Sequence, residues 1–271
     1  MSVNSNKYII QTMERISFFN LEDGTCYFQV DDLQEATMTN EQETVYATGK
    51  NGIKIGSSDR NKASRISATN GTVTDGVLAV QVGSDVTVGR VTIPKHFFQF
   101  VTTDGTSVEI KIKPMGNTGK EIPYIYKRNA DGTIGKPYPI AAEASTTAFK
   151  YDPGTKTITL PTDVFAAGET VYTFYDIEVD NAKHIVNDED KFSKTGMMVA
   201  DVFAKDTCTE KSYYGKVVYP KAKASGAFEL SFGNDPSVQA MEFEALSGGC
   251  GANSKRLWDF FVFDEDDATA A

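Results

Sequence analysis

Short stretches in which apolar and polar residues alternate recur along this chain and constrain its fold more than any other feature. The stretch "SVEIKIKP" places Val108, Ile110 and Ile112 on one side of an extended chain and charged residues on the other. Successive side chains of a β-strand point to opposite faces, so this period predicts strands with one buried face. Similar stretches, rich in β-branched and aromatic residues, are "GTCYFQVDD", "KTITLPTD", "TVYTFYDIEV", "GMMVADVFA", "YYGKVVYPKAK", "GAFELSFG" and "LWDFFVFD". The sequence therefore predicts a mainly β protein.

Three segments carry the residues that tight turns require. "NADGT" (129–133) and "YDPGTKT" (151–157) lie between predicted strands and are typical of hairpin turns. The stretch "TGKNGIKIGSSDRNK" (48–62) contains three glycines and three lysines, which raises the question of a phosphate-binding loop. Such a loop needs a lysine directly after its last glycine and a helix behind it, and both are missing. We therefore predict a hairpin turn that leads into a strand.

One segment has the spacing of a helix. Within "NGTVTDGVLAVQVGSD" (70–85), Val73, Val77 and Val80 recur at helical intervals, so all three are expected to pack on the sheet. Gly83 is expected to end the helix, because glycine readily adopts the left-handed conformation found after the last helical turn. The sequence thus predicts one helix beside a β structure.

The remaining segments are open to more than one interpretation. Residues 235–246 begin like a helix, but "VQAMEFEAL" also alternates, so a strand is an equal alternative. A length of 271 residues predicts one large β domain, or one domain that carries an insertion. Residues 264–271 contain four consecutive acidic residues and are expected to form a flexible, solvated tail.

The charge of the chain argues against sequence-specific nucleic-acid binding. It has 27 Lys and Arg residues against 37 Asp and Glu residues, which gives a net charge of −10. Affinity for DNA or RNA comes mostly from cationic side chains that neutralise phosphates. The acidic balance remains compatible with a protein that lets nucleic acid pass without binding it.

Residues that often carry chemistry are few and scattered. Cys26, Cys208 and Cys250 lack the spacing of a zinc site or a disulfide framework, and are expected to be buried free thiols. His96 and His184 flank strand patterns and are expected to be structural, and no hydrolase or metalloprotease motif occurs. We predict no catalytic site, no cofactor and no metal. No apolar run is long enough to span a bilayer, and the amino terminus lacks the pattern of a signal peptide.

In their order along the chain, these segments resemble a known family. The stretch "ERISFFNLEDGTCYFQVDDLQEATMTNEQETVYATGKNGIKIGSSDRNKASRISATNGTVTDGVLAVQVGSDV" is similar to the N-terminal half of major tail (tail tube) proteins of long-tailed bacteriophages. In those proteins an early strand is followed by a long polar arm, a glycine-rich turn, a strand of small polar residues and one helix. "GKVVYPKAKASGAFEL" and "CGANSKRLWDFFVF" are similar to their closing strands. The resemblance covers residues 14–113 and 180–263, and residues 114–179 do not align. The chain is therefore expected to form a single tail-tube domain, with an inserted β module or extended hairpins at 114–179.

The resemblance implies a structural protein of the virion and no enzyme. The fold it implies is a β-sandwich or barrel-like tail-tube fold with one flanking helix. Six subunits would form a ring, and rings would stack into a tail tube that conducts DNA without binding it specifically. Implied partners are further copies of the chain and tape-measure, tail-terminator and baseplate proteins, with assembly in the host cytoplasm and no membrane. Two alternatives stay open: another virion β protein (baseplate, capsid decoration or head–tail connector), or a ligand-binding β-sandwich.

Within this interpretation, residues 31–60 form a polar arm that we expect to contact the next ring. Between Leu33 and Val45 only Ala36 and Met38 are apolar, so the arm is too polar to bury much surface alone. We expect it to fold on contact with a neighbour, where the ordering entropy is offset. The residues predicted to form this ring-stacking arm are Asp32, Glu35, Thr39, Glu41, Glu43, Tyr46, Gly49, Gly52 and Gly56.

Two stretches are candidates for the strands that line the channel. "YFQVDDLQE" and "SVEIKIKP" carry charged residues on their polar faces. The predicted lumen-facing residues are Asp31, Glu35, Glu109 and Lys111. A surface that is negative on average would repel DNA phosphates and keep the duplex moving.

Overall fold

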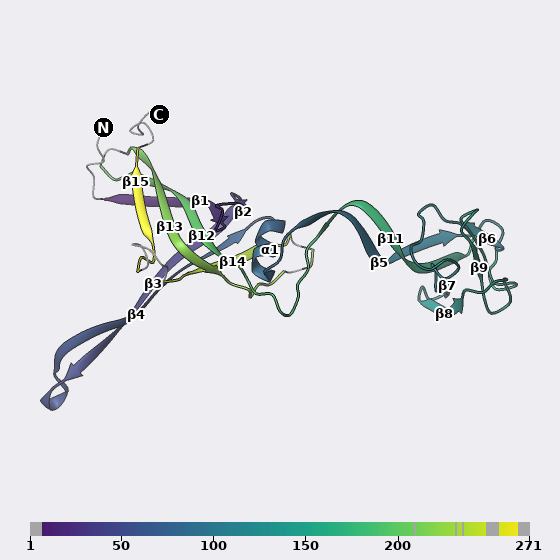
Figure 1. Cartoon of the computed structure of the whole chain (residues 1–271), viewed down its shortest axis with the longest axis horizontal. Coiled ribbons are helices and arrows are strands. Elements are labelled where there is room, and N and C mark those ends of the chain that lie inside the picture. Colours follow the sequence, from purple (N-terminus) through teal and green to yellow (C-terminus); the bar gives the residue numbers. More distant parts are fainter. Residues whose placement is uncertain (1–6, 209, 231, 235, 248–254, 265–271) are drawn as a thin grey trace. The chain divides into compact units, whose positions relative to one another are not determined.

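The chain folds into two compact units that are described separately. The computed structural model describes residues 7–208, 210–230, 232–234, 236–247 and 255–264 (Figure 1). Unit 1 comprises Met1–Val86 together with Ile185–Ala271, and unit 2 comprises Thr87–His184. Unit 2 is therefore inserted into unit 1 in sequence, and its first and last residues, Thr87 and His184, are paired across two antiparallel strands.

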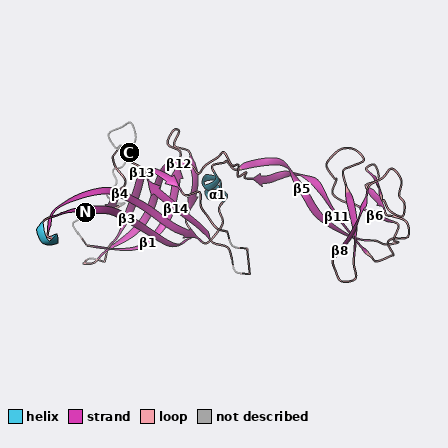
Figure 2. Cartoon of the chain, turned by 90° about the horizontal axis from the view of Figure 1, so that it is seen from below, coloured by secondary structure: helices cyan, strands magenta, loops and turns pink. Residues whose placement is uncertain are grey.

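Unit 1 is built on one antiparallel sheet. The strand order is β2-β1-β12-β13-β14-β4-β3, and β15 pairs with β13 beside β14. The strands are β1 (Tyr8–Phe19), β2 (Cys26–Val30), β3 (Leu33–Thr48), β4 (Lys54–Asn70), β12 (Thr195–Asp206), β13 (Ser212–Ala224), β14 (Gln239–Ala245) and β15 (Asp259–Phe263). Burial alternates along β12 and β14, as a period of two requires. The sheet is strongly curved (Figure 2) and encloses an apolar core.

Aromatic rings fill the centre of this core. The ring of Phe18 on β1 is stacked on that of Phe28 on β2, with centroids 5.8 Å apart. Phe243 on β14 lies 5.3 Å from Phe18, although the two residues are far apart in sequence. The buried hydroxyls of Ser64 and Tyr219 are hydrogen-bonded to each other at 2.7 Å, which satisfies both of them. Residues from both ends of the chain thus share one core.

Helix α1 (Asp75–Val82) covers part of this core and is the only α-helix among the described residues. Val77 and Val80 are each only 1% exposed and belong to the core, as predicted. Gly83 ends the helix with φ 76° in the left-handed region, also as predicted. The prediction for Val73 is wrong: it precedes the helix, and 45% of its surface is exposed. Val73 fits the helical spacing in the sequence, but the backbone of Thr74 is extended, so the helix begins only after Val73.

In unit 1 the structure decides one open alternative and shows one expectation to be wrong. The segment 235–246 contains strand β14 and no helix among its described residues, so the alternation in its sequence was the correct signal. Asp264 does not belong to a solvated tail, because it is buried and paired with Lys211. Residues 265–271, the remainder of the predicted tail, lie outside the described residues.

Unit 2 is a small β-sandwich. A four-stranded sheet of order β5-β11-β7-β8 and a three-stranded sheet of order β6-β10-β9 share one apolar core. The strands are β5 (Thr87–Val101), β6 (Ser107–Glu109), β7 (Tyr124–Arg128), β8 (Ile134–Pro139), β9 (Lys150–Asp152), β10 (Thr157–Thr159) and β11 (Thr170–His184). The turns at 129–133 and 151–157 join β7 to β8 and β9 to β10, as predicted. Residues 114–179, which resisted alignment, lie within this unit.

The predicted strand "SVEIKIKP" is shorter than its sequence pattern. Val108 and Ile110 are buried, but β6 already ends at Glu109, and Ile112 is 44% exposed. The carbonyl of Ile112 accepts a hydrogen bond from the Tyr175 hydroxyl at 3.0 Å, so the chain is held there by a side chain. Pairing with a neighbouring strand ends before the alternation does.

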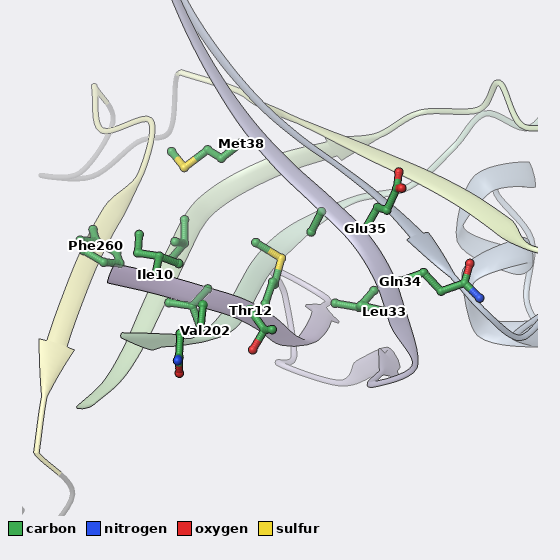
Figure 3. A pocket seen from close by; sticks show the side chains of 12 residues that line it. Ile10, Thr12, Leu33, Gln34, Glu35, Met38, Val202 and Phe260 are labelled. Carbon is green, nitrogen blue, oxygen red and sulfur yellow. The ribbon is translucent and has the colours of Figure 1, made fainter. Parts of the chain in front are cut away.

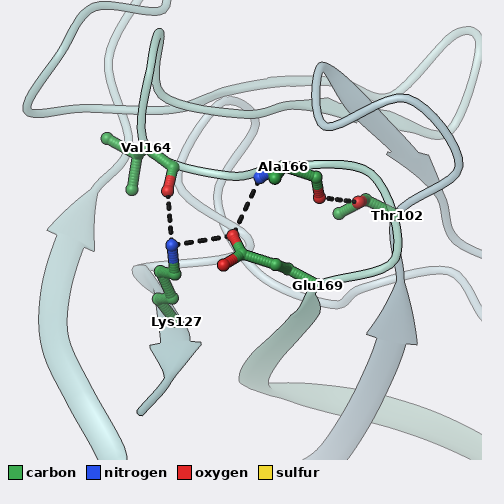
Figure 4. A network of polar contacts seen from close by, with 5 residues as sticks. All are labelled: Thr102, Lys127, Val164, Ala166 and Glu169. Atoms are coloured by element: carbon green, nitrogen blue, oxygen red, sulfur yellow. Dashed lines mark hydrogen bonds and ion pairs between the residues drawn. The ribbon is translucent and has the colours of Figure 1, made fainter. Parts of the chain in front are cut away.

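A network of polar contacts in unit 2 links β7 to the loop between β10 and β11 (Figure 4). The Lys127 ammonium donates to the carbonyl of Val164 at 2.8 Å and lies 2.7 Å from a carboxylate oxygen of Glu169. The same oxygen accepts the backbone N–H of Ala166 at 2.8 Å. The Thr102 hydroxyl donates to the carbonyl of Ala166 at 2.7 Å. One ion pair thereby holds the loop between β10 and β11.

This network predicts a pH-dependent stability for unit 2. Lys127, and after it the Ala166 N–H, lower the pKa of Glu169 below its ordinary value of 4.5. A depressed carboxyl pKa stabilises the fold above the ordinary pKa, and this contribution is lost as pH falls through the lower, folded-state pKa. Both side chains are about one third exposed, at 33% and 35%, so about 0.5–1 kcal/mol is expected.

Calorimetric unfolding between pH 6 and pH 3 measures this contribution. Glu169→Gln should lower the stability of unit 2 at pH 6 and reduce its loss on acidification. Glu143→Gln removes a carboxylate that is 83% exposed and serves as the matched control. Equal acid sensitivity in the Glu169→Gln variant and the wild type would show that the pair contributes nothing.

Candidate assembly surface

The predicted polar arm is a long β-hairpin. Strands β3 and β4 pair antiparallel and are joined by a 3₁₀ turn, η1 (Lys50–Gly52). β14 pairs with β4 only over Arg65–Asn70, so residues 41–63 form a two-stranded ribbon that projects from the sheet (Figure 1). At its base, the indole N–H of Trp258 donates to the Asn40 side-chain oxygen at 3.2 Å. The sheet and this contact fix the position at which the ribbon projects beyond the sheet.

The expectation that this arm lacks structure until it meets a neighbour is wrong. Its strands are paired within a single chain, and cross-strand polar contacts replace the missing apolar burial. Arg60 lies 2.6 Å from Glu43 and Arg65 lies 3.0 Å from Glu41. The hydrogen bond from Arg60 lowers the pKa of the Glu43 carboxyl. A polar sequence can thus form a hairpin, because strand pairing itself satisfies the backbone.

The residues predicted for the arm are spread along this hairpin. Asp32 precedes β3, Gly49 and Gly52 lie at the turn, Gly56 lies in β4, and the others, Glu35, Thr39, Glu41, Glu43 and Tyr46, lie in β3. Seven of the nine are exposed, and Thr39 and Gly49 are half-buried. Their contact with another ring remains a prediction.

The backbone of the turn favours glycine at one of the three tip positions, and a second is closely packed. Gly52 has φ 76°, a conformation that favours glycine. A Cβ atom on Gly49 would lie only 3.0 Å from the Ile55 side chain, so the turn packs closely there. A Cβ on Gly56 would meet nothing within 4 Å, and its backbone is unstrained. The stretch 48–62 is therefore a hairpin turn leading into a strand, as predicted.

A groove lies between β1 and β3, two strands that are not neighbours in the sheet. Figure 3 shows its walls, with Thr12 on β1 and Leu33 on β3, and Val202 of β12 also lines it. We call it the seam groove; it has a volume of about 410 Å³. Its lining residues are Ile10, Gln11, Thr12, Met13, Leu33, Gln34, Glu35, Ala36, Met38, Val202, Val217 and Phe260. Both walls are strand edges without a partner strand in the described part of the chain.

Sequence reasoning missed this groove and the apolar character of the arm's end. Ile53 and Ile55 are 64% and 70% exposed, and Val45 and Tyr46 are also exposed. The Lys54 ammonium lies 3.6 Å from the centre of the Tyr46 ring. The alternation in "GIKIG" is a local signal for the two isoleucines, because it places both on one side of an extended chain. The groove had no local signal, because its walls come from separate segments.

The four residues predicted to face a channel are divided between the two units. Asp31 and Glu35 belong to unit 1, whereas Glu109 and Lys111 belong to unit 2. All four are exposed. Lys111 follows the end of β6 and is not part of a strand. Facing a channel remains a prediction for each of them.

Charge is distributed unequally between the units. Unit 2, Thr87–His184, contains eleven Lys and Arg residues and eleven Asp and Glu residues. The whole excess of ten acidic residues, from 37 against 27, therefore lies in unit 1. A repulsive field toward nucleic acid would originate from unit 1.

The residues considered for chemistry are not brought together. His96 and His184 are exposed on β5 and β11. Cys26 and Cys208 are exposed free thiols, so the expected burial is wrong for both, and Cys250 lies outside the described residues. Cys26 lies near the start of a sheet-edge strand, where alternation alone does not determine burial. The described residues contain no cluster of three or more side chains that could hold a metal ion.

The comparisons with known proteins agree with the architecture. A model of the YomU/Tube protein family matches residues 8–255, which is most of the chain. No curated protein matches significantly. None of the helices in the described residues is long and apolar enough to cross a membrane. The match spans nearly all of unit 1's sheet and the whole of unit 2. The chain therefore belongs to the YomU/Tube protein family and is a phage tube-like structural protein.

Proposed function

We propose that this chain is the major tail-tube subunit of a long-tailed bacteriophage. Six copies form a ring, and rings stack into a hollow tube that conducts DNA during ejection. The number six and the passage of DNA come from the resemblance to major tail proteins, and the family match supports a tube. The protein acts by shape and has no catalytic role.

The observation that carries this proposal is the long hairpin that projects from a curved sheet. An isolated two-stranded ribbon is only marginally stable in water. Residues 41–63 nevertheless extend beyond the rest of the sheet and expose apolar side chains at their end. Such a feature is explained when the ribbon lies against another subunit, and a stacked ring supplies one.

Free strand edges support association with further copies of the chain. β3 ends the sheet, and β1 between Ile9 and Met13 pairs on one side only among the described residues. Unpaired edges are templates for pairing with another chain, and an assembly in which a further copy covers them removes this exposure. The proposed tube thus accounts for edges that a monomer leaves open.

The acidic excess of unit 1 supports a channel through which DNA slides. We propose that acidic residues of unit 1, Asp31 and Glu35 among them, face the lumen. Repulsion of phosphates would prevent the duplex from adhering to the wall. Further partners on this proposal are tape-measure, tail-terminator and baseplate proteins, and the site of action is the virion tail after assembly in the host cytoplasm.

Electron microscopy of the purified full-length protein tests the proposal, together with light scattering to determine the mass of the smallest assembly. We expect striated hollow tubes, or rings with the mass of six subunits. A protein that stays monomeric at high concentration, where weak ring contacts should form, would contradict a tube function. Compact closed shells without a channel would favour a different virion role.

A further inference from the structure

We propose that the arm tip of one copy, residues 44–58, occupies the seam groove of a second copy in the next ring. This proposal rests on the tube function proposed above and names the surface that receives the arm. Four properties of the groove and the tip support it: open strand edges, apolar character, charge and distance.

The seam groove offers both backbone and apolar contacts. Its walls, β1 and β3, present strand edges that an added extended segment can pair with. The buried residues Val202 and Val217 also line the groove, and Met13, Leu33 and Met38 are partly buried against the core. A volume of about 410 Å³ accommodates a few aliphatic side chains. The groove is thus shaped to receive an apolar, extended segment.

The arm tip is such a segment. Ile53 and Ile55 are more than half exposed. Exposure of aliphatic side chains to water is unfavourable in free energy relative to their burial against apolar surface. Exposed apolar strands carry a risk of uncontrolled aggregation unless a partner covers them. Burial of these isoleucines in an apolar groove removes that risk.

The charges of the two surfaces are complementary. Between Thr44 and Ser58 the tip contains two charged residues, Lys50 and Lys54, and no acidic ones. Among the described lining residues of the groove, Glu35 is the only charged one, and Asp31 and Asp32 precede it in the chain. Opposite charges on facing surfaces steer association and fix its register.

The tip cannot reach the groove of its own chain. Ala36 lines the groove and Tyr46 lies at the tip, and both belong to the same extended strand. Ten residues of a strand span roughly 33 Å, so the tip lies far from its own groove. A contact between two different surfaces of identical chains does not close on itself when it repeats along one direction. It therefore extends an assembly ring by ring.

The double variant Ile53→Asp/Ile55→Asp of the full-length chain tests the apolar contact. Both side chains are exposed in the single chain, so its fold and melting temperature should not change. We expect rings to form as in the wild type but tubes to fall at least tenfold, because carboxylates are poorly accommodated on an apolar surface. Ile134→Asp changes an isoleucine of unit 2 that is 47% exposed, and should leave tube yield unchanged.

Charge reversal tests whether the two surfaces meet directly. Glu35→Lys alone, and Lys50→Glu/Lys54→Glu alone, should each reduce tube yield. The three changes combined should restore it, because the reversed charges again face opposite ones. Loss without restoration in the combined variant would show that Glu35 does not face the tip.

A cross-link identifies the contact by position. With the three native cysteines replaced by Ser, Ala36→Cys/Ile55→Cys should form disulfide-linked chains in assembled tubes, and Ala36→Cys/Ile134→Cys should not. Two results together would overturn this inference while leaving the tube function intact. The Ile53→Asp/Ile55→Asp variant would form tubes at the wild-type yield, and tubes of the Ala36→Cys/Ile55→Cys variant would give no cross-link. A wild type that forms neither rings nor tubes would instead contradict the tube function itself.

Discussion

Replacement of Val77 by Asp is expected to prevent unit 1 from folding. Val77 is 1% exposed on α1 and belongs to the core that includes Phe18 and Phe28. The close approach of α1 to β2 leaves no room for adjustment, because a Cβ on Gly76 would already lie 2.7 Å from the Tyr27 carbonyl oxygen. An unpaired carboxylate at this depth costs several kcal/mol, a large share of the stability of a typical domain.

Expression, solubility and thermal melting measure this effect. The variant should be insoluble, or should melt far below the wild type. Val73→Asp is the matched control, because Val73 lies four residues earlier and is 45% exposed. A Val77→Asp variant with unchanged melting would place this helix face in water. If Val73→Asp lowered the solubility and melting temperature as much as Val77→Asp, Val73 would have to be buried as well.

Replacement of Tyr175 by Ala is expected to unfold unit 2 without unfolding unit 1. The Tyr175 ring is fully buried and stacked on Phe98 with centroids 4.2 Å apart, and its hydroxyl donates to the Ile112 carbonyl. Burial raises the pKa of Tyr175, so its neutral, hydrogen-bond-donating form is present at all ordinary pH values. Removal of a buried aromatic side chain costs about 3–5 kcal/mol.

Hydrogen exchange followed by mass spectrometry separates the two units. In the Tyr175→Ala variant, amides of 87–184 should lose protection, and those of β12 and β13 should keep it. Tyr124→Ala, at a position that is 45% exposed on β7, should leave both units protected. Simultaneous loss of protection in unit 1 would mean that the two units fold as one cooperative body.

The sequence alone determined the local elements of the protein. Alternation identified the positions of β2, β6, β10 to β13 and β15, because burial on one face imposes a period of two whatever the partner strand is. The prediction of a strand at "GAFELSFG" (226–233) was wrong, because the described residues of this segment form no strand. Turn residues located the hairpins at 129–133 and 151–157, and the glycines of 48–62 marked the end of the arm, since turn geometry depends on adjacent residues. Resemblance to tail-tube proteins also came from the sequence, and the family match supports its coarser form, a phage tube-like protein.

Alternation was less informative at element ends. It carried "SVEIKIKP" past Glu109, where pairing stops, and helical spacing included Val73, which precedes α1. Polarity alone suggested an arm without structure, whereas ion pairs such as Arg60–Glu43 stabilise a paired hairpin.

Only the tertiary structure decided which strands meet. β1 pairs with β12, although about 180 residues separate Ile16 from its partner Ala200, and the inserted unit 2 lies between them in sequence. The seam groove draws its lining residues from β1, β3, β12, β13 and β15, so it exists only once these strands are paired in one sheet. Strand pairing depends on the complementarity of whole faces and on the twist of the sheet, and no local pattern of residues specifies either.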